Sequence, residues 1–332
     1  MQKLMNDPNN FVDEMLDGFV DANPHLCRDG ENLRVIRAVT PLRPGKVGIV
    51  TGGGSGHLPL FTGYVGKGLL DACAVGDVFE GPSVGSCMRA IQTANSGKGV
   101  LRLYGNYGGD RMNFDMAGEL LEGKIDTTSV LGCDDIASAG PAEATKRRGV
   151  AGIVYAYKAA GAAADEGRSL EEVTTVAQKV IRRTRTIGLA LSGCKVPGAG
   201  KPSFEIAAGE IEMGLGIHGE PGLWRDRMKP ADDLVDEMLD RLLADKPDEA
   251  GDTVSIIVNS LGATSQEELF ILYRRASAEL RRRGYRVVSS LVGRYVTSME
   301  MAGASISLCF ADDELHKLLA APASCPFWQV TR

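Results

Sequence analysis

The sequence predicts an α/β protein built from two α/β domains, each with a mixed or parallel β-sheet covered by helices. Short apolar runs typical of buried strands alternate along the chain with amphipathic stretches typical of helices. The length of 332 residues favours two domains over one. The 41 glycines cluster after apolar runs, where α/β proteins place their functional turns.

The first half of the chain begins with a helical pattern and then alternates between strand and helix patterns. Phe11, Met15 and Phe19 follow helical spacing within residues 1–30. Further helices are expected at 83–93, 112–123 and 170–187, strands at 46–50, 72–79, 99–104 and 128–131, and an apolar segment at 151–157.

A domain boundary is expected near residues 185–205, because residues 192–202 are rich in glycine, proline and lysine. The predicted domains are therefore 1–187 and 188–332. In the second, strands are expected at 211–217, 254–259, 286–291 and 305–310, and helices at 230–244, 265–284 and 312–320.

Composition restricts the class of protein. The chain is 44% hydrophobic and 24% charged, with a net charge of −6, which argues against nucleic-acid and anionic-membrane partners. Its apolar runs are too short to span a bilayer, and residues 1–10 do not resemble a signal peptide. The seven cysteines are scattered without a CxxC pair, which predicts free thiols and a cytoplasmic location.

Two of the four histidines lie in glycine-rich turns. Glycines stand at 214, 216 and 219 around His218, and they make a core histidine implausible. A metal site is disfavoured because no second ligand stands at the usual spacing, so an active imidazole is the preferred interpretation. The other histidine, His57, ends the turn Gly52–His57.

The turn Gly52–His57 follows a strand and exposes backbone N–H groups that can hold a small polar ligand. A tight structural turn is the alternative. Asp110 ends the turn of a different strand, where it could cap the next helix. Together His57 and Asp110 resemble an acid–base pair acting on a polyol.

Other motifs are weaker. Residues 198–203 fail as a phosphate loop, because Pro202 follows Lys201 where serine or threonine is required. The pair Asp134 and Asp135 could bind magnesium, but helix capping is preferred, and no metal site is predicted. The basic clusters 146–148 and 281–283 are expected to be solvated helix ends.

These motifs together resemble the dihydroxyacetone kinase family, specifically its triose-binding K subunit. The similarity covers nearly the whole chain and is most specific in Gly52–His57, Asn106–Phe114 and Met213–Gly222. It implies that His218 bonds covalently to the substrate carbonyl carbon as a hemiaminal, which selects ketones over plain polyols.

The resemblance also assigns roles to the other site residues. His57 is implied to bind substrate, with Gly54, Ser55 and Gly56 adding backbone or hydroxyl contacts. Asp110 is implied to be a general base for the phosphorylated oxygen.

The resemblance implies that the phosphoryl donor binds elsewhere. No cofactor is expected on this chain, which has no room for a donor domain after Arg332. ATP, or ADP with magnesium, would bind a separate helical L subunit, and in some systems a phosphotransferase-linked M subunit recharges the ADP. The K subunit is expected to be a homodimer.

Two positions depart from the family pattern. Gly105 replaces a usual lysine, and Leu58 replaces a usual glutamate. These changes alter the rim of the pocket, so erythrulose or another short ketose is an alternative substrate to dihydroxyacetone. A non-catalytic regulatory paralogue is a further alternative.

Overall fold

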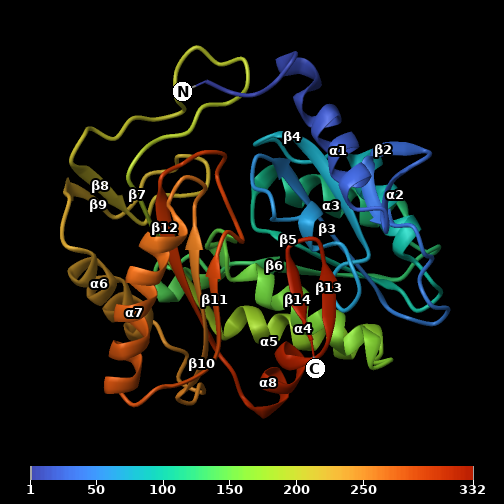
Figure 1. The fold of residues 1–332 in the computed structure, drawn as a ribbon. Coiled ribbons are helices and arrows are strands. Elements are labelled where there is room, and N and C mark those ends of the chain that lie inside the picture. The colour runs from blue at the N-terminus through green and yellow to red at the C-terminus, as the bar shows by residue number, and fades with distance from the viewer. Residues whose placement is uncertain (1, 332) are drawn as a thin grey trace.

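The computed structural model describes residues 2–331 and contains two six-stranded β-sheets that lie side by side (Figure 1). Both sheets mix parallel and antiparallel neighbours and are covered by helices, which confirms the predicted α/β class. No helix within residues 2–331 is long and apolar enough to cross a membrane.

The first sheet has the order β1-β2-β4-β3-β5-β6. Its strands are β1 (Leu26–Asp29), β2 (Asn32–Ala38), β3 (Gly48–Ser55), β4 (Ala72–Val78), β5 (Val100–Gly105) and β6 (Thr127–Gly132). Strand β3 pairs in parallel with both β4 and β5. The carboxyl ends of these three strands therefore meet at one edge of the sheet.

Helices cover both faces of this sheet. They are α1 (Phe11–Ala22), α2 (Val84–Ala94), α3 (Gly108–Leu120), α4 (Ile153–Asp165) and α5 (Leu170–Arg182). In α4, every residue from Ile153 to Ala164 is buried, because the helix packs against the sheet, α5 and the C-terminal helix. Helix α5 starts with a capping box between Ser169 and Glu172.

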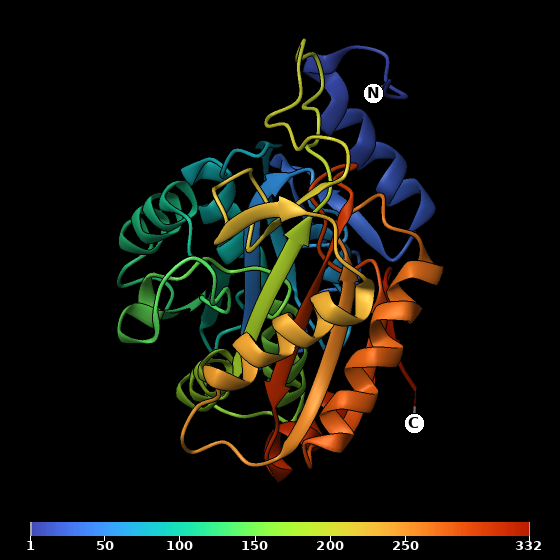
Figure 2. The ribbon, with the colours of Figure 1, turned by 90° about the vertical axis from the view of Figure 1, so that its left-hand side faces the viewer.

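The second sheet has the order β11-β10-β12-β7-β8-β9. Its strands are β7 (Thr184–Ala190), β8 (Glu210–Met213), β9 (Trp224–Arg227), β10 (Thr253–Ser260), β11 (Arg286–Gly293) and β12 (Gly303–Phe310). Figure 2 shows α6 (Ala231–Ala244) and α7 (Gln266–Arg282) on the outer face of this sheet. The chain ends with α8 (Asp313–Ala320) and the hairpin β13 (Ala323–Cys325) and β14 (Trp328–Val330).

Each sheet with its covering helices is called a lobe, the first lobe containing β1–β6 and the second containing β7–β12. The inner face of the second sheet shares a hydrophobic core with the first lobe. Ile257 of β10 and Cys309 of β12 belong to the same buried cluster as the residues of α4. Helix α8 also returns to α4, where the buried Lys158 ammonium donates to the Leu318 carbonyl at 2.7 Å. A shared core of this kind holds the two lobes together.

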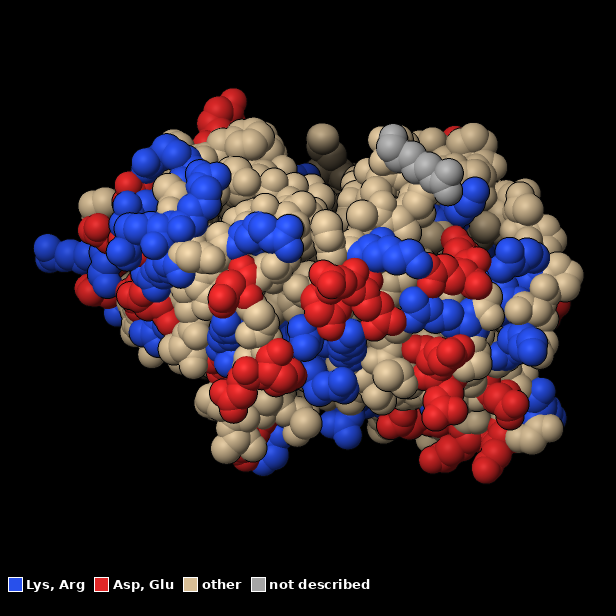
Figure 3. All heavy atoms as spheres, turned by 90° about the horizontal axis from the view of Figure 1, so that it is seen from below, with Lys and Arg blue, Asp and Glu red and all other residues tan. Residues whose placement is uncertain are grey.

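The lower surface carries both signs of charge. Figure 3 shows basic and acidic side chains lying next to one another over much of this face. Lys179 of α5 pairs with Glu314 of α8 at 2.8 Å, and Lys317 pairs with Glu166 at 2.9 Å. Partly exposed surface pairs of this type contribute little stability individually.

Several element boundaries differ from the expectations. The expected helix 170–187 ends at Arg182, because β7 begins at Thr184. The expected domain boundary between residues 187 and 188 falls inside β7, all of which lies in the second sheet. The apolar segment 151–157 is the start of helix α4.

The strand expected at 211–217 ends at Met213, so a loop rather than a strand leads into His218. The hairpin β1–β2 was not expected, because its residues are rich in charge. The prediction of solvated ends for residues 146–148 was wrong for Arg147. Its side chain is 1% exposed and binds Asp245 at 2.6 Å.

Candidate active site between the two lobes

His57 extends from the carboxyl end of β3 and is almost completely buried. Its Nδ1 lies 2.7 Å from the backbone carbonyl oxygen of Thr297, which comes from the second lobe. A carbonyl oxygen only accepts hydrogen bonds, so Nδ1 of His57 must carry the proton. The lone pair of its Nε2 is then directed away from Thr297.

His218 lies in the loop between β8 and β9 and meets His57 directly. The two Nε2 atoms are 2.9 Å apart. On the other side of the ring, Nδ1 of His218 lies 3.1 Å from a carboxylate oxygen of Glu220. The structure thus brings the two histidines of the glycine-rich turns together.

These contacts determine where the protons lie. Burial disfavours the Glu220 charge, but hydrogen bonding from His218 and attraction to Arg148 outweigh burial and lower the pKa of Glu220 to about 2. An ionised carboxylate only accepts, so Nδ1 of His218 donates to it. The Nε2–Nε2 contact then requires one further proton between the two rings.

The shared proton lies between the two Nε2 atoms. Burial and the neighbouring charge of His218 lower the pKa of His57 to about 3, so His57 resists protonation. The pair of rings in the site without ligand therefore carries one positive charge, which the Glu220 carboxylate balances.

Aromatic rings surround the histidine pair. The Phe79 ring stacks on His57 with centroids 5.0 Å apart and meets His218 at 5.4 Å. The Tyr107 ring packs edge-on against His218 at 4.9 Å. Phe79 follows β4 and Tyr107 follows β5, so the carboxyl ends of three neighbouring strands contribute to the site.

Asp110 lies in the first turn of α3 and is 6% exposed. Burial raises its pKa to about 7, and its Oδ1 has no hydrogen-bond partner within residues 2–331. Among the described residues no hydrogen bond joins Asp110 to either histidine. A Cβ on Gly81 would lie 2.7 Å from its Oδ1, so Asp110 packs against the segment that begins at Phe79.

The turn residues before His57 have structural partners. The Ser55 hydroxyl donates to the carbonyl oxygen of Gly76 at 2.8 Å. The carbonyl oxygen of Gly56 accepts from the backbone N–H of Met299 at 2.7 Å. A side chain on Gly54 would collide with the backbone of Phe79 and Glu80, since its Cβ would lie 2.9 and 2.8 Å away. These glycines allow the close approach of the segments that frame His57.

Asp134 and Asp135 have structural roles. Asp134 accepts from the backbone N–H groups of Val150 and Gly152 at 3.0 and 2.7 Å, just before α4. Asp135 binds Arg148 at 2.7 Å. Within residues 2–331, no group of three or more His, Cys, Asp or Glu side chains is arranged to hold a metal ion.

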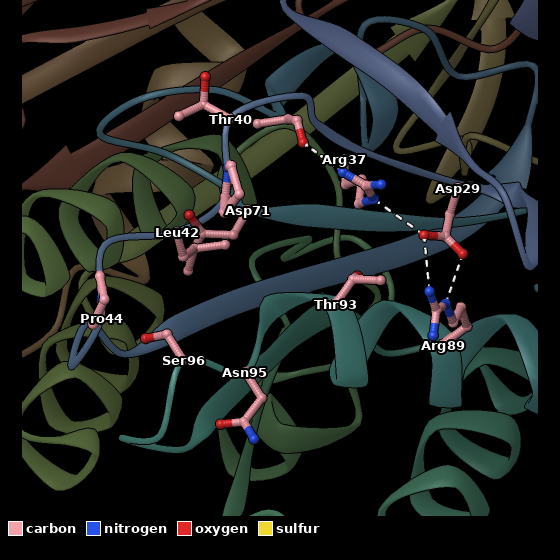
Figure 4. Close-up of a pocket in the computed structure, with 12 residues that line it drawn as sticks. Asp29, Arg37, Thr40, Leu42, Pro44, Asp71, Arg89, Thr93, Asn95 and Ser96 are labelled. Atoms are coloured by element: carbon pink, nitrogen blue, oxygen red, sulfur yellow. Dashed lines mark hydrogen bonds and ion pairs between the residues drawn. The ribbon is translucent and has the colours of Figure 1, made fainter.

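A separate cavity of about 450 Å³ lies in the first lobe near β1, β2 and α2 (Figure 4). Its buried carboxylate, Asp29, binds Arg89 at 2.6 Å and Arg37 at 3.0 Å. The two guanidinium groups therefore already occupy this carboxylate. None of the site residues expected from the sequence lines this cavity.

Sequence reasoning assigned no role to several residues of the site. Glu220 stands two positions after His218 in the same motif, and that proximity was its only signal. Phe79 was expected only as the end of the strand 72–79, and Tyr107 only as part of the turn that follows the strand 99–104. The Thr297 carbonyl is separated from His57 by 240 positions and carries no sequence signal.

Comparison with known proteins gives consistent results. A family model for the Dak1 domain matches residues 17–327. The chain is 44% identical over 330 residues to a D-erythrulose kinase of Mycolicibacterium smegmatis, covering 99% of this chain and 57% of that protein. It is 43% identical over 332 residues to the dihydroxyacetone-binding subunit DhaK of a PTS-dependent dihydroxyacetone kinase of Listeria innocua, covering 99% of this chain and 100% of that protein.

The fold is also similar to that of a solved structure. The dihydroxyacetone kinase operon co-activator Dha-DhaQ superposes with a TM-score of 0.89 and 32% identity, covering 96% of this chain and 98% of that one. The similar proteins thus include a ketose-binding subunit, a ketose kinase and a regulator.

Proposed function

Because this chain belongs to the Dak1 domain family, we propose that it is the substrate-binding subunit of a dihydroxyacetone kinase. His218 captures the ketone as a covalent hemiaminal, and a separate L subunit supplies the phosphoryl group. The observation that carries this proposal is the direct contact between Nε2 of His218 and Nε2 of His57, beside the rings of Phe79 and Tyr107.

Hemiaminal formation needs a free lone pair on Nε2 of His218 and a proton for the carbonyl oxygen. The shared proton passes to Nε2 of His57 as the ketone enters. The freed lone pair of His218 then bonds to the carbonyl carbon, and the electron pair of the C=O π bond moves to oxygen. His57 gives the proton to that oxygen, because its low pKa of about 3 makes its protonated form a strong acid.

The products of this step are a hydroxyl group on the former carbonyl carbon, a neutral His57 and an imidazolium on His218 that faces Glu220. Atoms and charges therefore balance without an external reagent. Glycerol lacks the carbonyl carbon and cannot be captured in this way.

Asp110 is the proposed general base for the terminal hydroxyl that receives the phosphoryl group. Its pKa of about 7 suits proton abstraction near neutral pH. Its unpaired Oδ1 is a free acceptor for that hydroxyl. Backbone contacts from Gly54, Ser55 and Gly56 are proposed to complete the substrate site.

The donor site is proposed to lie on the L subunit, which would bind ATP, or ADP with magnesium. The similarity to a protein named as the dihydroxyacetone-binding subunit of a PTS-dependent kinase supports a separate donor chain. Where the donor is ADP, an M-type phosphotransferase subunit would recharge it. A homodimer in the cytoplasm is proposed as the working form, and the seven free thiols are compatible with a reducing compartment.

A kinase for erythrulose or another short ketose is the second candidate. The similarity to a D-erythrulose kinase and the replacement of the usual rim residues by Gly105 and Leu58 favour it. A Cβ on Gly105 would lie 2.9 Å from the Tyr107 ring, so a larger residue there would move a ring that touches His218. The third candidate, a regulator, is supported by the similarity to the co-activator.

A ketose panel distinguishes these candidates. The chain, with a cognate L subunit and donor, is incubated with dihydroxyacetone, D-erythrulose, L-erythrulose and glycerol, and phosphate ester formation is measured. We expect the wild-type protein to support phosphorylation of dihydroxyacetone and the His218→Ala variant to lose this activity. Turnover of four-carbon ketoses alone would transfer the assignment to erythrulose. Capture without turnover of any ketose would indicate the regulator.

A further inference from the structure

Glu220 contacts His218 in two ways. Its Oε1 accepts from Nδ1 of the ring at 3.1 Å, and its Oε2 accepts from the backbone N–H of the same residue at 2.5 Å. A carboxylate held by both the ring and the backbone of one histidine fixes the orientation of that ring. It also fixes the tautomer, because Nδ1 must keep its proton.

The carboxylate of Glu220 is itself held in place from the first lobe. The Arg148 guanidinium approaches its Oε2 at 3.6 Å and binds Asp135 at 2.7 Å. Arg148 also donates to the carbonyl oxygen of Gly214, at the start of the histidine loop, at 3.2 Å. A charge network that crosses between the lobes therefore ends at the His218 ring.

Gly216 leaves the space that this network requires. A Cβ at this position would lie 2.0 Å from Oε2 of Glu220 and 2.3 Å from Nη1 of Arg148. Any side chain here would displace the carboxylate from His218. The glycine between the strand and the histidine is therefore explained by the carboxylate, not by a ligand contact.

We propose that Glu220 is a positioning residue for covalent capture. It holds His218 as the tautomer whose Nε2 lone pair points toward the ketone, and it neutralises the imidazolium that forms when Nε2 bonds to carbon. Arg148 and Asp135 keep the carboxylate in place. This inference depends on the proposed hemiaminal function.

The chemistry explains why a carboxylate is required. Addition of Nε2 to a carbonyl carbon leaves a positive charge on a ring that is three-quarters buried, with a side-chain exposure of 25%. An ion pair with Glu220 stabilises this charge, whereas a neutral group would leave it uncompensated. In the adduct the charge can no longer be shared with His57, so the stabilisation of His218 by Glu220 matters most there.

The test is Glu220→Gln, which keeps the shape of the side chain but removes its charge. The amide can also turn its NH₂ group toward the ring and favour the opposite tautomer. We expect covalent adduct formation with dihydroxyacetone, measured by intact mass after reductive or acid trapping, to fall about 10- to 100-fold. The ¹⁵N resonances of His218 in the ligand-free protein should show loss of the Nδ1-protonated form.

Two further variants separate positioning from folding. Glu205→Gln makes the same chemical change at an exposed position and should leave the adduct and the ¹⁵N resonances unchanged. Gly216→Ala keeps the carboxylate but displaces it, and it should reproduce the Glu220→Gln resonances. Thermal melts establish that each variant is folded.

The outcomes distinguish the two proposals. If wild-type protein forms no adduct with dihydroxyacetone, the proposed function fails, whatever Glu220 does. If wild-type protein forms the adduct and Glu220→Gln forms it equally well with unchanged ¹⁵N resonances, the role of Glu220 is refuted and the function stands.

Discussion

Asp110, the proposed general base, illustrates at the scale of the single residue how a proposed catalytic role conflicts with stability. Folding buries its carboxyl group, leaves one oxygen without a partner in the described part of the chain and raises its pKa from the ordinary 3.8 to about 7. The folded state therefore binds this proton more tightly than the unfolded state does. Stability falls as pH rises between these two values, by an amount on the order of 4 kcal/mol.

Asp110→Asn removes this titration. We expect the melting temperature of the variant to exceed that of the wild-type protein more at pH 8 than at pH 5, because only the wild-type residue loses its proton in that interval. Phosphoryl transfer should fall by about 10²- to 10⁴-fold. Asp115→Asn, on the exposed side of the same helix, is the control for both measurements. An equal melting-temperature difference at the two pH values would contradict the buried-base account.

His57 titrates in the opposite direction. Its pKa is depressed to about 3, so the unfolded chain binds more protons than the folded one below the ordinary value of 6.5. Its contribution to stability is complete above that value and is lost as pH falls toward 3. Burial thus shifts the two pKa values of the proposed acid–base pair in opposite directions, which keeps His57 neutral and leaves Asp110 partly protonated near neutral pH.

The turn between β3 and His57 is the element on which the site depends. Gly56 has a φ of +100°, and a Cβ there would lie 2.8 Å from the Phe79 ring and 2.9 Å from the Met299 sulfur. Phe79 itself has a φ of +62°, which is rare for a large residue. The turn and the Phe79 segment therefore constrain each other around the imidazole.

Gly56→Ala tests this constraint. We expect it to lower the free energy of unfolding by about 2–4 kcal/mol, from backbone strain together with the collision. The matched control is Gly97→Ala, because Gly97 has a φ of +93° but open space around its Cβ position. Gly97→Ala should cost only about 1 kcal/mol and leave ketone capture intact. Equal losses in chemical denaturation would show that the collision is unimportant.

Elements were predictable where their patterns are strong. Residues 266–282 form a helix with a serine cap, and residues 254–259 form a buried apolar strand; both follow the expected periodicity. The predicted helix 170–187 was too long at its C-terminal end. Residues 184–187 continue the amphipathic pattern of the helix, but in the structure they pair with β12 as part of a strand. Local periodicity could not reveal that pairing, which depends on a strand more than 100 positions away.

The whole molecule is connected by a buried ion pair as well as by its core. Arg147, from the loop between β6 and α4, binds Asp245 at 2.6 and 2.8 Å, and Asp245 ends helix α6. Arg185 of β7 binds the same carboxylate. One acidic side chain therefore holds two arginines where the second lobe meets the first.

Asp245→Asn should be strongly destabilising. It would leave Arg147, 1% exposed, without its counter-charge, which typically costs about 3–5 kcal/mol. Asp252→Asn removes an exposed carboxylate that pairs with Lys246 and is 70% exposed, and it should cost less than about 1 kcal/mol. Equilibrium unfolding of the two variants gives the comparison. Similar small losses would mean that Arg147 finds another partner.

Some residues of the candidate site could be predicted from the sequence, whereas the contacts between them could not. Glycine-rich turns identified His57 and His218, since such turns expose a side chain at a strand end. Their direct contact spans 161 positions, and the anchor at Thr297 uses only a backbone carbonyl. Contacts made by backbone atoms leave no residue-type pattern, so only the folded chain could show them.

Covalent capture by His218 is the central claim, and one measurement tests it most directly. Dihydroxyacetone labelled with ¹³C at its carbonyl carbon is added to protein labelled with ¹⁵N on histidine. The account predicts a protein-bound tetrahedral carbon coupled to Nε2 of His218, which disappears in His218→Ala and does not form with glycerol. A bound carbonyl carbon that remains trigonal, with full turnover in the presence of the L subunit, would contradict it.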